Sequence, residues 1–184
     1  MRILTLVLLA ALPFSLFAQK KGEPTWPELN IDSKTNLISY SEVPNVDGVS
    51  APDLYDKAYE WLKGYYKNYA EKLRKSDKDA GEIEIFGRFP IYVYDKKGVK
   101  TTSRQGLIQY TLTILLKDGR YKYEITKLNH KAKSYEPLEK WLDREDSNAT
   151  NHAYYLTDID AEIKDVIASL KKAMSSTEKA ADDW

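Results

Sequence analysis

Few side chains in this 184-residue chain are suited to nucleophilic or acid–base chemistry. The chain has two histidines, His130 and His152, and no cysteine, so a thiol nucleophile is excluded. None of the short motifs of serine hydrolases, dinucleotide-binding folds, phosphate-binding loops or zinc proteases occurs. Both histidines lie among polar residues, beside Asn129 and Asn151, and we expect both to be exposed to solvent.

Carboxylates are the remaining candidates for metal binding. Asp158, Asp160 and Glu162 alternate like the first ligands of a calcium loop, but the required glycine and the later glutamate are missing. These acids fit better at the start of a helix, where the positive end of the helix dipole favours them. A second acidic group, in residues 143–146, fits a solvated loop. We therefore expect no metal and no cofactor.

Catalysis by a pair of carboxylates is the remaining enzymatic possibility. A glycosidase needs two carboxylates across a cleft, and the candidates on expected strands are Glu42, Glu84 and Glu124. Pairing with lysines on neighbouring strands explains these glutamates more simply. We therefore favour a non-enzymatic protein, with a hydrolase of envelope glycan or lipid as the alternative.

The first eighteen residues have the layout of a secretory signal peptide. A basic start, Met1-Arg2, precedes the apolar residues 3–17, and Ala18 offers a small residue for cleavage before Gln19. The alternative is a transmembrane anchor, but a bilayer core needs roughly 20 apolar residues. We expect a periplasmic or secreted protein of a Gram-negative bacterium, with no transmembrane segment after cleavage.

The chain after residue 18 is long enough for one domain without disulfides. Removing 18 of 184 residues leaves 166, and a chain near this size buries roughly 68–70% of its surface on folding. We expect a flexible leader over residues 19–34, a single domain over residues 35–175 and a frayed tail over residues 176–184.

Strand-forming sequences dominate the first two thirds of the domain. A first strand is predicted over residues 35–43 from its β-branched and aromatic residues. A two-residue hydrophobic period predicts further strands over residues 83–94, 108–116 and 121–125. Between the last two, Asp118-Gly119 predicts a tight hairpin. A sheet of four or five antiparallel strands follows from this order.

Two long amphipathic helices are predicted on either side of these strands. Apolar residues at three- and four-residue steps mark residues 50–72 and 158–174, and each segment begins with a capping sequence. A short apolar helix, with Trp141 turned inward, is expected over residues 137–142. The fold class is therefore α+β, with two long helices packed on one face of the antiparallel sheet.

Charge is unevenly distributed although the formal net charge is zero. Residues 88–133 contain 11 lysines and arginines against 3 acids, and residues 136–184 contain 6 against 12. The simpler explanation of this asymmetry is that the two segments neutralise each other across the fold. The alternative, which would imply a function, is a basic sheet face that binds an anionic partner. Export from the cytoplasm removes most nucleic-acid partners, so we expect no nucleic-acid binding.

Several stretches between residues 37 and 128 resemble a known family. They are the strand over residues 38–43, the stretch 46–50 before the helix, Leu54-Tyr55 with Ala58, Trp61 and Leu62, and the hairpin over residues 110–125. Together they resemble the secreted bacterial domain of unknown function that has a TBP-like fold. The resemblance implies a meandering sheet with helices on one face and implies no activity, because fold alone does not determine function.

These observations lead to one functional hypothesis. We expect an exported, non-enzymatic binding or interaction module of the cell envelope, whose partner is an unknown envelope protein, glycan or lipid. Tyrosine and tryptophan favour half-wet contacts, and the chain has 14 Tyr and 4 Trp. The residues predicted to touch the partner from the open sheet face are Tyr92, Tyr94, Arg120 and Lys122. Self-association, as a structural envelope component, is a third possibility.

Overall fold

The computed structural model describes residues 24–175. The predicted signal peptide (residues 1–18) and C-terminal tail (residues 176–184) lie outside the described residues. The elements are, in chain order, β1 (Tyr40–Glu42), α1 (Ala51–Tyr65), α2 (Tyr69–Lys72), β2 (Leu73–Asp77), β3 (Glu82–Tyr94), β4 (Lys100–Lys117), β5 (Arg120–Lys131), β6 (Tyr135–Pro137), the 3-10 helix η1 (Leu138–Leu142) and α3 (Ala149–Ser175).

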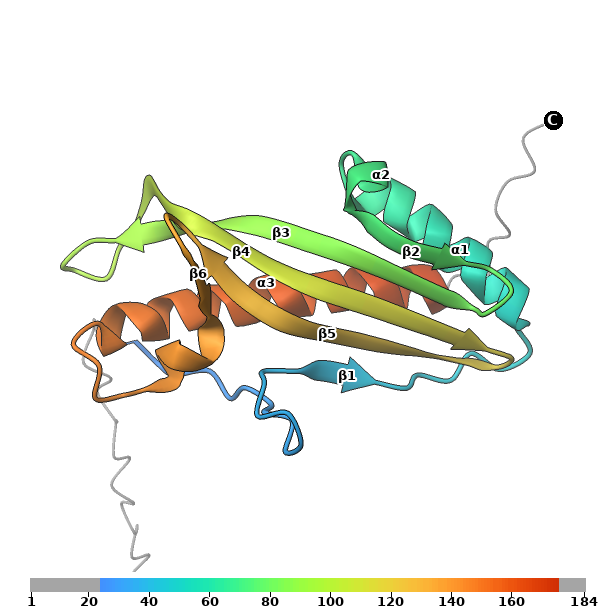
Figure 1. Cartoon of the computed structure of the whole chain (residues 1–184), viewed down its shortest axis with the longest axis horizontal. Helices are drawn as coiled ribbons and strands as arrows, with labels where there is room; N and C mark the ends of the chain where they lie inside the picture. The colour runs from blue at the N-terminus through green and yellow to red at the C-terminus, as the bar shows by residue number, and fades with distance from the viewer. Residues whose placement is uncertain (1–23, 176–184) are drawn as a thin grey trace, which may run out of the picture.

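One antiparallel sheet holds all six strands (Figure 1). The strand order is β1-β5-β4-β3-β2, and β6 pairs with the same edge of β5 as β1 does. β1 lies beside Tyr123–Ile125, and β6 lies beside Asn129–Lys131. The sheet predicted from the sequence is confirmed, with two short strands added at its edges.

The predicted hairpin joins the long neighbouring strands β4 and β5. Lys117 pairs with Arg120 across it, and Gly119 has a φ of +72°, a left-handed conformation that glycine adopts without steric cost. Gly119 also donates its N–H to Val49 at 2.9 Å. The hairpin tip is therefore fastened to the chain just before α1.

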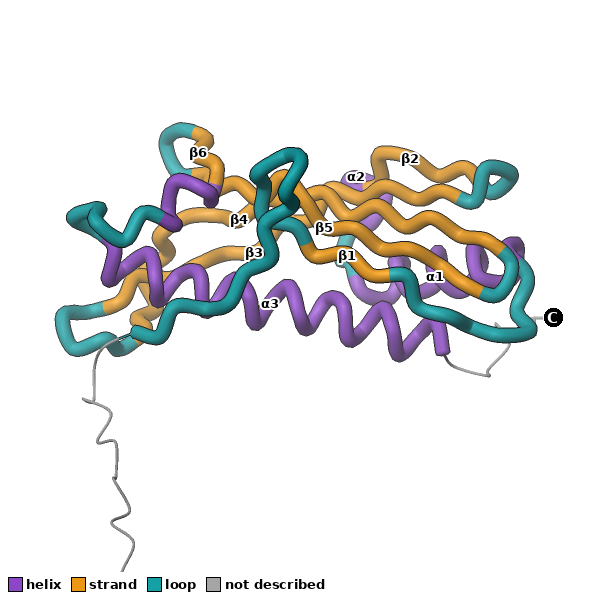
Figure 2. The backbone as a smooth tube through the Cα atoms, turned by 90° about the horizontal axis from the view of Figure 1, so that it is seen from below, coloured by secondary structure: helices purple, strands orange, loops and turns teal. Residues whose placement is uncertain are grey.

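Helices α1 and α3 lie on one face of the sheet, and within residues 24–175 the other face carries no long helix (Figure 2). Between the sheet and the helices lies a core of fully buried aliphatic side chains. Strands contribute Ile83, Ile85, Leu112, Ile114 and Ile125, and helices contribute Leu54, Leu62 and Ile163. The predicted α+β arrangement, with two long helices on one sheet face, is confirmed.

α3 is longer than the sequence predicted. It begins at Ala149, so Thr157 is an interior residue whose hydroxyl donates to Ala153 O at 2.9 Å. The prediction that a cap at Thr157 starts the helix is therefore wrong. Tyr155 and Leu156 are buried against the sheet, and this packing extends the apolar stripe of the helix by two turns.

The polar stretch after α1 also forms structure where a loop was expected. The helix predicted over residues 50–72 ends at Tyr65, and residues 73–77 form the edge strand β2. Lys75 makes an ion pair with Glu82 at 2.7 Å. Charged side chains suit an edge strand because they discourage pairing with another molecule.

Residues 24–34, part of the predicted leader, lie against the domain. Trp26 and Leu29 pack on the core, and Ile31 forms a β-bridge with Ile38. The guanidinium of Arg144 lies 5.1 Å from the ring centre of Trp26. Across residues 24–175, no helix combines the length and the apolar character needed to cross a bilayer.

Candidate functional site

The four residues predicted to form one contact surface lie at two different ends of the sheet. Tyr92 pairs with Arg104 on β4, whereas Lys122 pairs with Leu115. Eleven residues of β4 separate these positions, which corresponds to roughly 35 Å at about 3.3 Å per residue. Arg120 and Lys122 lie at the hairpin end, and Tyr92 and Tyr94 lie at the opposite end.

A hollow of about 290 Å³ at the hairpin end contains Arg120 and Lys122. We call its five exposed or half-exposed residues the hairpin patch: Val43, Leu115, Lys117, Arg120 and Lys122. Val43 is 54% exposed and Leu115 is 38% exposed. Strand alternation turns Leu115 away from the helices, because its neighbours Ile114 and Leu116 are buried.

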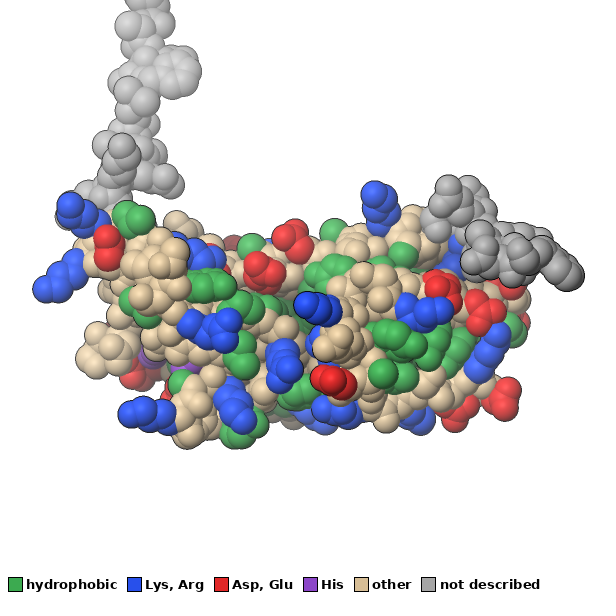
Figure 3. Space-filling model, turned by 90° about the horizontal axis from the view of Figure 1, so that it is seen from above, with side chains coloured by type: hydrophobic (Ala, Val, Ile, Leu, Met, Phe, Trp, Pro, Cys, Tyr) green, Lys and Arg blue, Asp and Glu red, His purple; other side chains and the backbone are tan. Residues whose placement is uncertain are grey.

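Three cations surround the two exposed apolar residues of the hairpin patch. Lys122 makes an ion pair with Glu124 at 3.0 Å. Within residues 24–175, Lys117 and Arg120 make no side-chain ion pair. Figure 3 views a different side of the molecule, from above Figure 1, and there too lysines and arginines lie among hydrophobic side chains.

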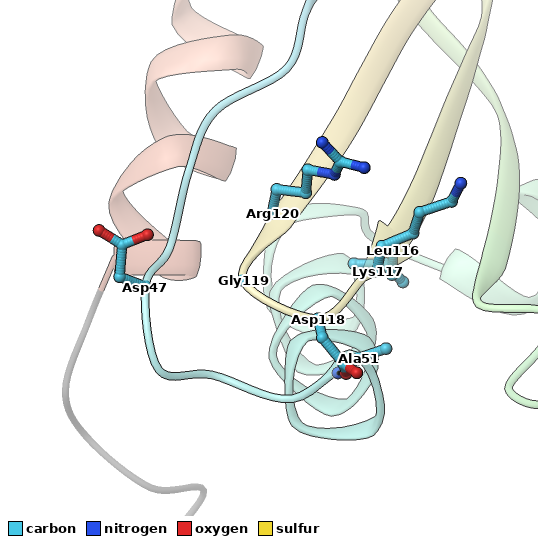
Figure 4. A pocket seen from close by; sticks show the side chains of 7 residues that line it. All are labelled: Asp47, Ala51, Leu116, Lys117, Asp118, Gly119 and Arg120. Atoms are coloured by element: carbon cyan, nitrogen blue, oxygen red, sulfur yellow. Dashed lines mark hydrogen bonds between the residues drawn. The ribbon is translucent and has the colours of Figure 1, made fainter.

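A second hollow, of about 630 Å³, lies at the tip of the same hairpin. It holds two carboxylates, and Figure 4 shows that they do not converge. Asp118 points to the start of α1 and accepts a hydrogen bond from Ala51 N at 2.7 Å, whereas Asp47 points away from it. Asp118 therefore caps a helix, which is a structural role.

Tyr94 does not lie on the open face. Its ring stacks on Tyr154 of α3, with 4.6 Å between ring centres and 10° between planes. The placement predicted for Tyr94 from strand alternation is wrong, because the pairing of β3 with β4 shifts register on either side of Tyr92. Burial raises the pKa of Tyr94, and a hydrogen bond to Asp158 raises it further by a smaller amount.

Tyr92 is also connected to α3 rather than to the hairpin patch. The ammonium of Lys100 lies 5.7 Å from the ring centre of Tyr92 and 2.9 Å from the carboxylate of Asp158. Lys100 therefore links the end of β3 to the helix layer. Neither tyrosine is part of the hairpin patch.

We call the end of the sheet where His130 and His152 lie the histidine end. There the structure differs most from what the sequence predicted. His130 is only 7% exposed, so the prediction of a solvent-exposed side chain is wrong. Opposite Tyr110, β5 has an extra residue, and Lys127 there adopts a φ of +56°. This bulge reverses the alternation along β5 and turns Leu128 and His130 towards the helices.

His130 and His152 lie on either side of Trp141. The ring centres of Trp141 and His152 are 5.1 Å apart with 3° between planes, and those of Trp141 and His130 are 5.0 Å apart. The indole N–H of Trp141 donates to Glu136 Oε2 at 2.9 Å. Burial lowers the pKa of His130; the Gln105 carbonyl and Glu136 oppose this effect, and His152 adds to it.

Several of the acids considered as catalytic or metal-binding groups already have partners, among them Glu42, Glu124, Asp158 and Asp160. Glu42 accepts hydrogen bonds from Tyr123 and Lys171, which lower its pKa. Glu84 and Glu124 flank Thr113 on neighbouring strands, and neither lines the hollows at the hairpin end or the pocket beside His130. Asp160 accepts hydrogen bonds from the Tyr40 hydroxyl and the Lys164 ammonium. Residues 24–175 contain no cluster of three metal-ligating side chains.

Comparison with solved structures supports the fold. A TBP-like protein from Parabacteroides distasonis has a TM-score of 0.65 at 18% identity, covering 80% of this chain and 99% of that one. A DUF4468 family protein from Bacteroides ovatus has a TM-score of 0.60 at 18% identity, covering 84% and 93%. None of the curated proteins compared with this chain matches it.

The family is established by the sequence of the segment that runs from β1 to β5. Residues 40–131, from β1 to the end of β5, match the family described as a domain of unknown function (DUF4468) with TBP-like fold. The matched segment covers all but the first three residues of the region, residues 37–128, whose sequence resembled that family. It contains the hairpin patch and His130 but not His152. This chain belongs to the DUF4468 family of domains of unknown function with a TBP-like fold.

Proposed function

We propose that the protein is an exported, non-enzymatic binding module of the cell envelope, and that the hairpin patch contacts its partner. One observation carries this proposal: Lys117 and Arg120, which make no ion pair in the described part of the chain, flank the exposed side chains of Val43 and Leu115. Such a surface suits a partner that presents anionic groups beside an apolar one.

Physical chemistry favours contact at this place. Covering exposed Val43 and Leu115 removes apolar surface from water, at about 25 cal/mol per Å². Unpaired exposed cations attract an anionic partner and speed its encounter, and added salt weakens that attraction. The buried strand residues on the other face hold the patch in place, so little ordering is required on binding.

The hydrolase alternative lacks a specific observation in its favour. Catalysis by paired carboxylates requires two groups that face the same substrate. Asp47 and Asp118 share a hollow in the described residues but point apart, and Asp118 is occupied at the start of α1. Binding without catalysis is therefore the better supported function.

The test measures binding of the purified protein to anionic and zwitterionic lipid vesicles, to soluble envelope glycans and to envelope protein extract. The double variant Leu115→Ser/Arg120→Glu should lose most binding to whichever fraction the wild type binds. Its matched control is Val99→Ser/Lys96→Glu, which makes the same kinds of change at exposed positions in the β3–β4 turn.

The two variants separate a specific surface from general charge. A loss confined to the Leu115/Arg120 variant supports the hairpin patch, and the loss should grow smaller as salt is raised. Equal losses in both variants, or unchanged binding in both, would place the contact elsewhere. Turnover of a glycan or lipid by the wild type would contradict the non-enzymatic assignment.

A further inference from the structure

The histidine end holds a small polar pocket that the hairpin patch does not involve. The pocket measures about 260 Å³ and lies between the β4–β5–β6 edge, η1 and the start of α3. We call it the histidine pocket; its polar lining is Gln105, His130, Glu136, Asn148, Asn151 and His152. We propose that it binds a neutral, hydroxyl-rich small molecule, such as one sugar unit of a glycan.

Buried nitrogen atoms without partners are the first reason. His130 Nε2 and His152 Nδ1 are shielded from solvent and have no partner of good hydrogen-bond geometry within the described chain, although the Gln105 carbonyl lies close enough to the His130 ring to oppose the lowering of its pKa. Buried polar atoms are nearly always hydrogen-bonded, and an unpaired one calls for an explanation. A ligand that carries hydroxyl groups supplies partners to imidazole nitrogens in either tautomer.

Size is the second reason. A pocket of about 260 Å³ exceeds the share of about 30 Å³ that one water molecule occupies in the liquid. It is slightly below the range of about 300–1,000 Å³ typical of pockets for drug-sized ligands. The pocket therefore suits a molecule with the dimensions of a single sugar ring.

The chemistry of the lining selects a neutral ligand. Glu136 places a carboxylate in the wall, which repels an anion. The N-terminal end of α3, where Asn148 and Asn151 lie, disfavours a cation. The amides of Gln105, Asn148 and Asn151 offer donors and acceptors side by side, and each sugar hydroxyl needs both.

The pocket is built on a rigid frame. Trp141 is 3% exposed and holds both imidazoles by ring contact, while its N–H is fixed by Glu136. A Cβ on residue 106 would lie 2.3 Å from His130 Nε2, so Gly106 leaves the space that the imidazole needs. Fixed groups of this kind bind a small ligand without a large ordering cost.

The experiment titrates the full-length protein with D-glucose, D-galactose and N-acetylglucosamine, and separately with acetate and inorganic phosphate. Binding is followed by calorimetry and by NMR shifts of the histidine rings and the Trp141 indole N–H. Saturable binding of at least one sugar is expected, with shifts at His130, His152 and Trp141. Asn151→Leu should weaken it by about fivefold to tenfold, the effect of losing one hydrogen bond.

Controls make the outcome decisive. Arg120→Glu, in the hairpin patch, should leave sugar binding unchanged, so this test is independent of the proposed partner surface. Gln105→Leu supplies a second pocket variant if Asn151→Leu does not fold. Saturation by acetate or phosphate in place of sugar, or no saturable shift with any sugar at its highest soluble concentration, would overturn the proposal.

Discussion

The two ends of the sheet use the same strands in opposite ways. At the hairpin end, apolar Val43 and Leu115 are exposed among cations. At the other end, polar His130 is buried against Trp141. The difference comes from what covers β5: β6, η1 and the first turns of α3 close over the histidine end, whereas only short β1 borders β5 near the hairpin.

This contrast underlies the two recognition surfaces that we propose. An open strand surface presents a broad patch that suits a large partner. A covered strand end encloses polar groups and suits a small ligand. If the contrast is real, substitutions at the histidine end should reduce stability strongly, and substitutions at the hairpin end should change binding with little effect on stability.

The largest expected effect is from Trp141→Ala. The indole is buried between two imidazoles and Tyr155, and truncating a buried tryptophan costs about 3–5 kcal/mol of unfolding free energy. Urea unfolding measures the loss. Trp141→Phe is the matched control and should lose distinctly less. A cost below about 1 kcal/mol for the alanine variant would show that this end is not well packed.

Acidification should also destabilise the histidine end. The pKa of His130 lies below its ordinary value of 6.5 in the folded protein, because burial disfavours the charged ring. Below about pH 6.5 the unfolded chain therefore binds more protons, and the unfolding free energy falls as the pH falls, by at most about 1.4 kcal/mol per pH unit.

Unfolding curves between about pH 5 and 7 test this effect of His130. His130→Phe should remove part of the pH dependence, because it deletes the group that titrates beside His152, Glu136 and the Gln105 carbonyl. The same pH dependence in the wild type and in His130→Phe would assign the effect to another group.

A smaller loss is expected from Asp118→Ala at the hairpin tip. The carboxylate caps Ala51 N at 2.7 Å, and loss of a helix cap costs about 1 kcal/mol. Thermal unfolding should show it. Asp47→Ala, in the same hollow but pointing away, should change stability by less than about 0.5 kcal/mol. Equal losses in the two variants would contradict the distinction between them.

The smallest effect on stability is expected from Arg120→Ala. Its side chain is exposed and makes no ion pair within residues 24–175, so unfolding free energy should stay within about 0.5 kcal/mol of wild type. Binding to the anionic partner should nevertheless weaken. A clear loss of stability would mean that the hairpin patch serves the fold rather than a partner.

Elements with strong local signals were predicted correctly from the sequence. Asp118-Gly119 specified the β4–β5 hairpin, because glycine accepts the backbone conformation of the tight turn. Ser50, whose hydroxyl accepts from Asp53 N at 3.3 Å, marked the start of α1. The family resemblance over this region was confirmed by the match of residues 40–131.

Features without a local signal were missed. Nothing around Lys127 indicates a left-handed residue, and its bulge decides that His130 faces inward. Similarly, α3 extends back to Ala149 because Tyr155 packs on Trp141, a partner outside the helix. The predicted contact surface was divided for the same kind of reason, since Tyr94 follows a shift of register and meets Tyr154.

The sequence by itself determined the order of strands and helices and the side chains that form the core, because hydrophobic period and turn chemistry act over a few residues. Tertiary structure alone decided which surfaces are covered. Ile38 N donates a hydrogen bond to Glu139, and the Tyr40 hydroxyl donates one to Asp160; the partners are 101 and 120 residues apart in the chain. Such contacts depend on how whole elements pack, and they leave apolar side chains exposed at the hairpin end while they bury His130 at the other end of the sheet.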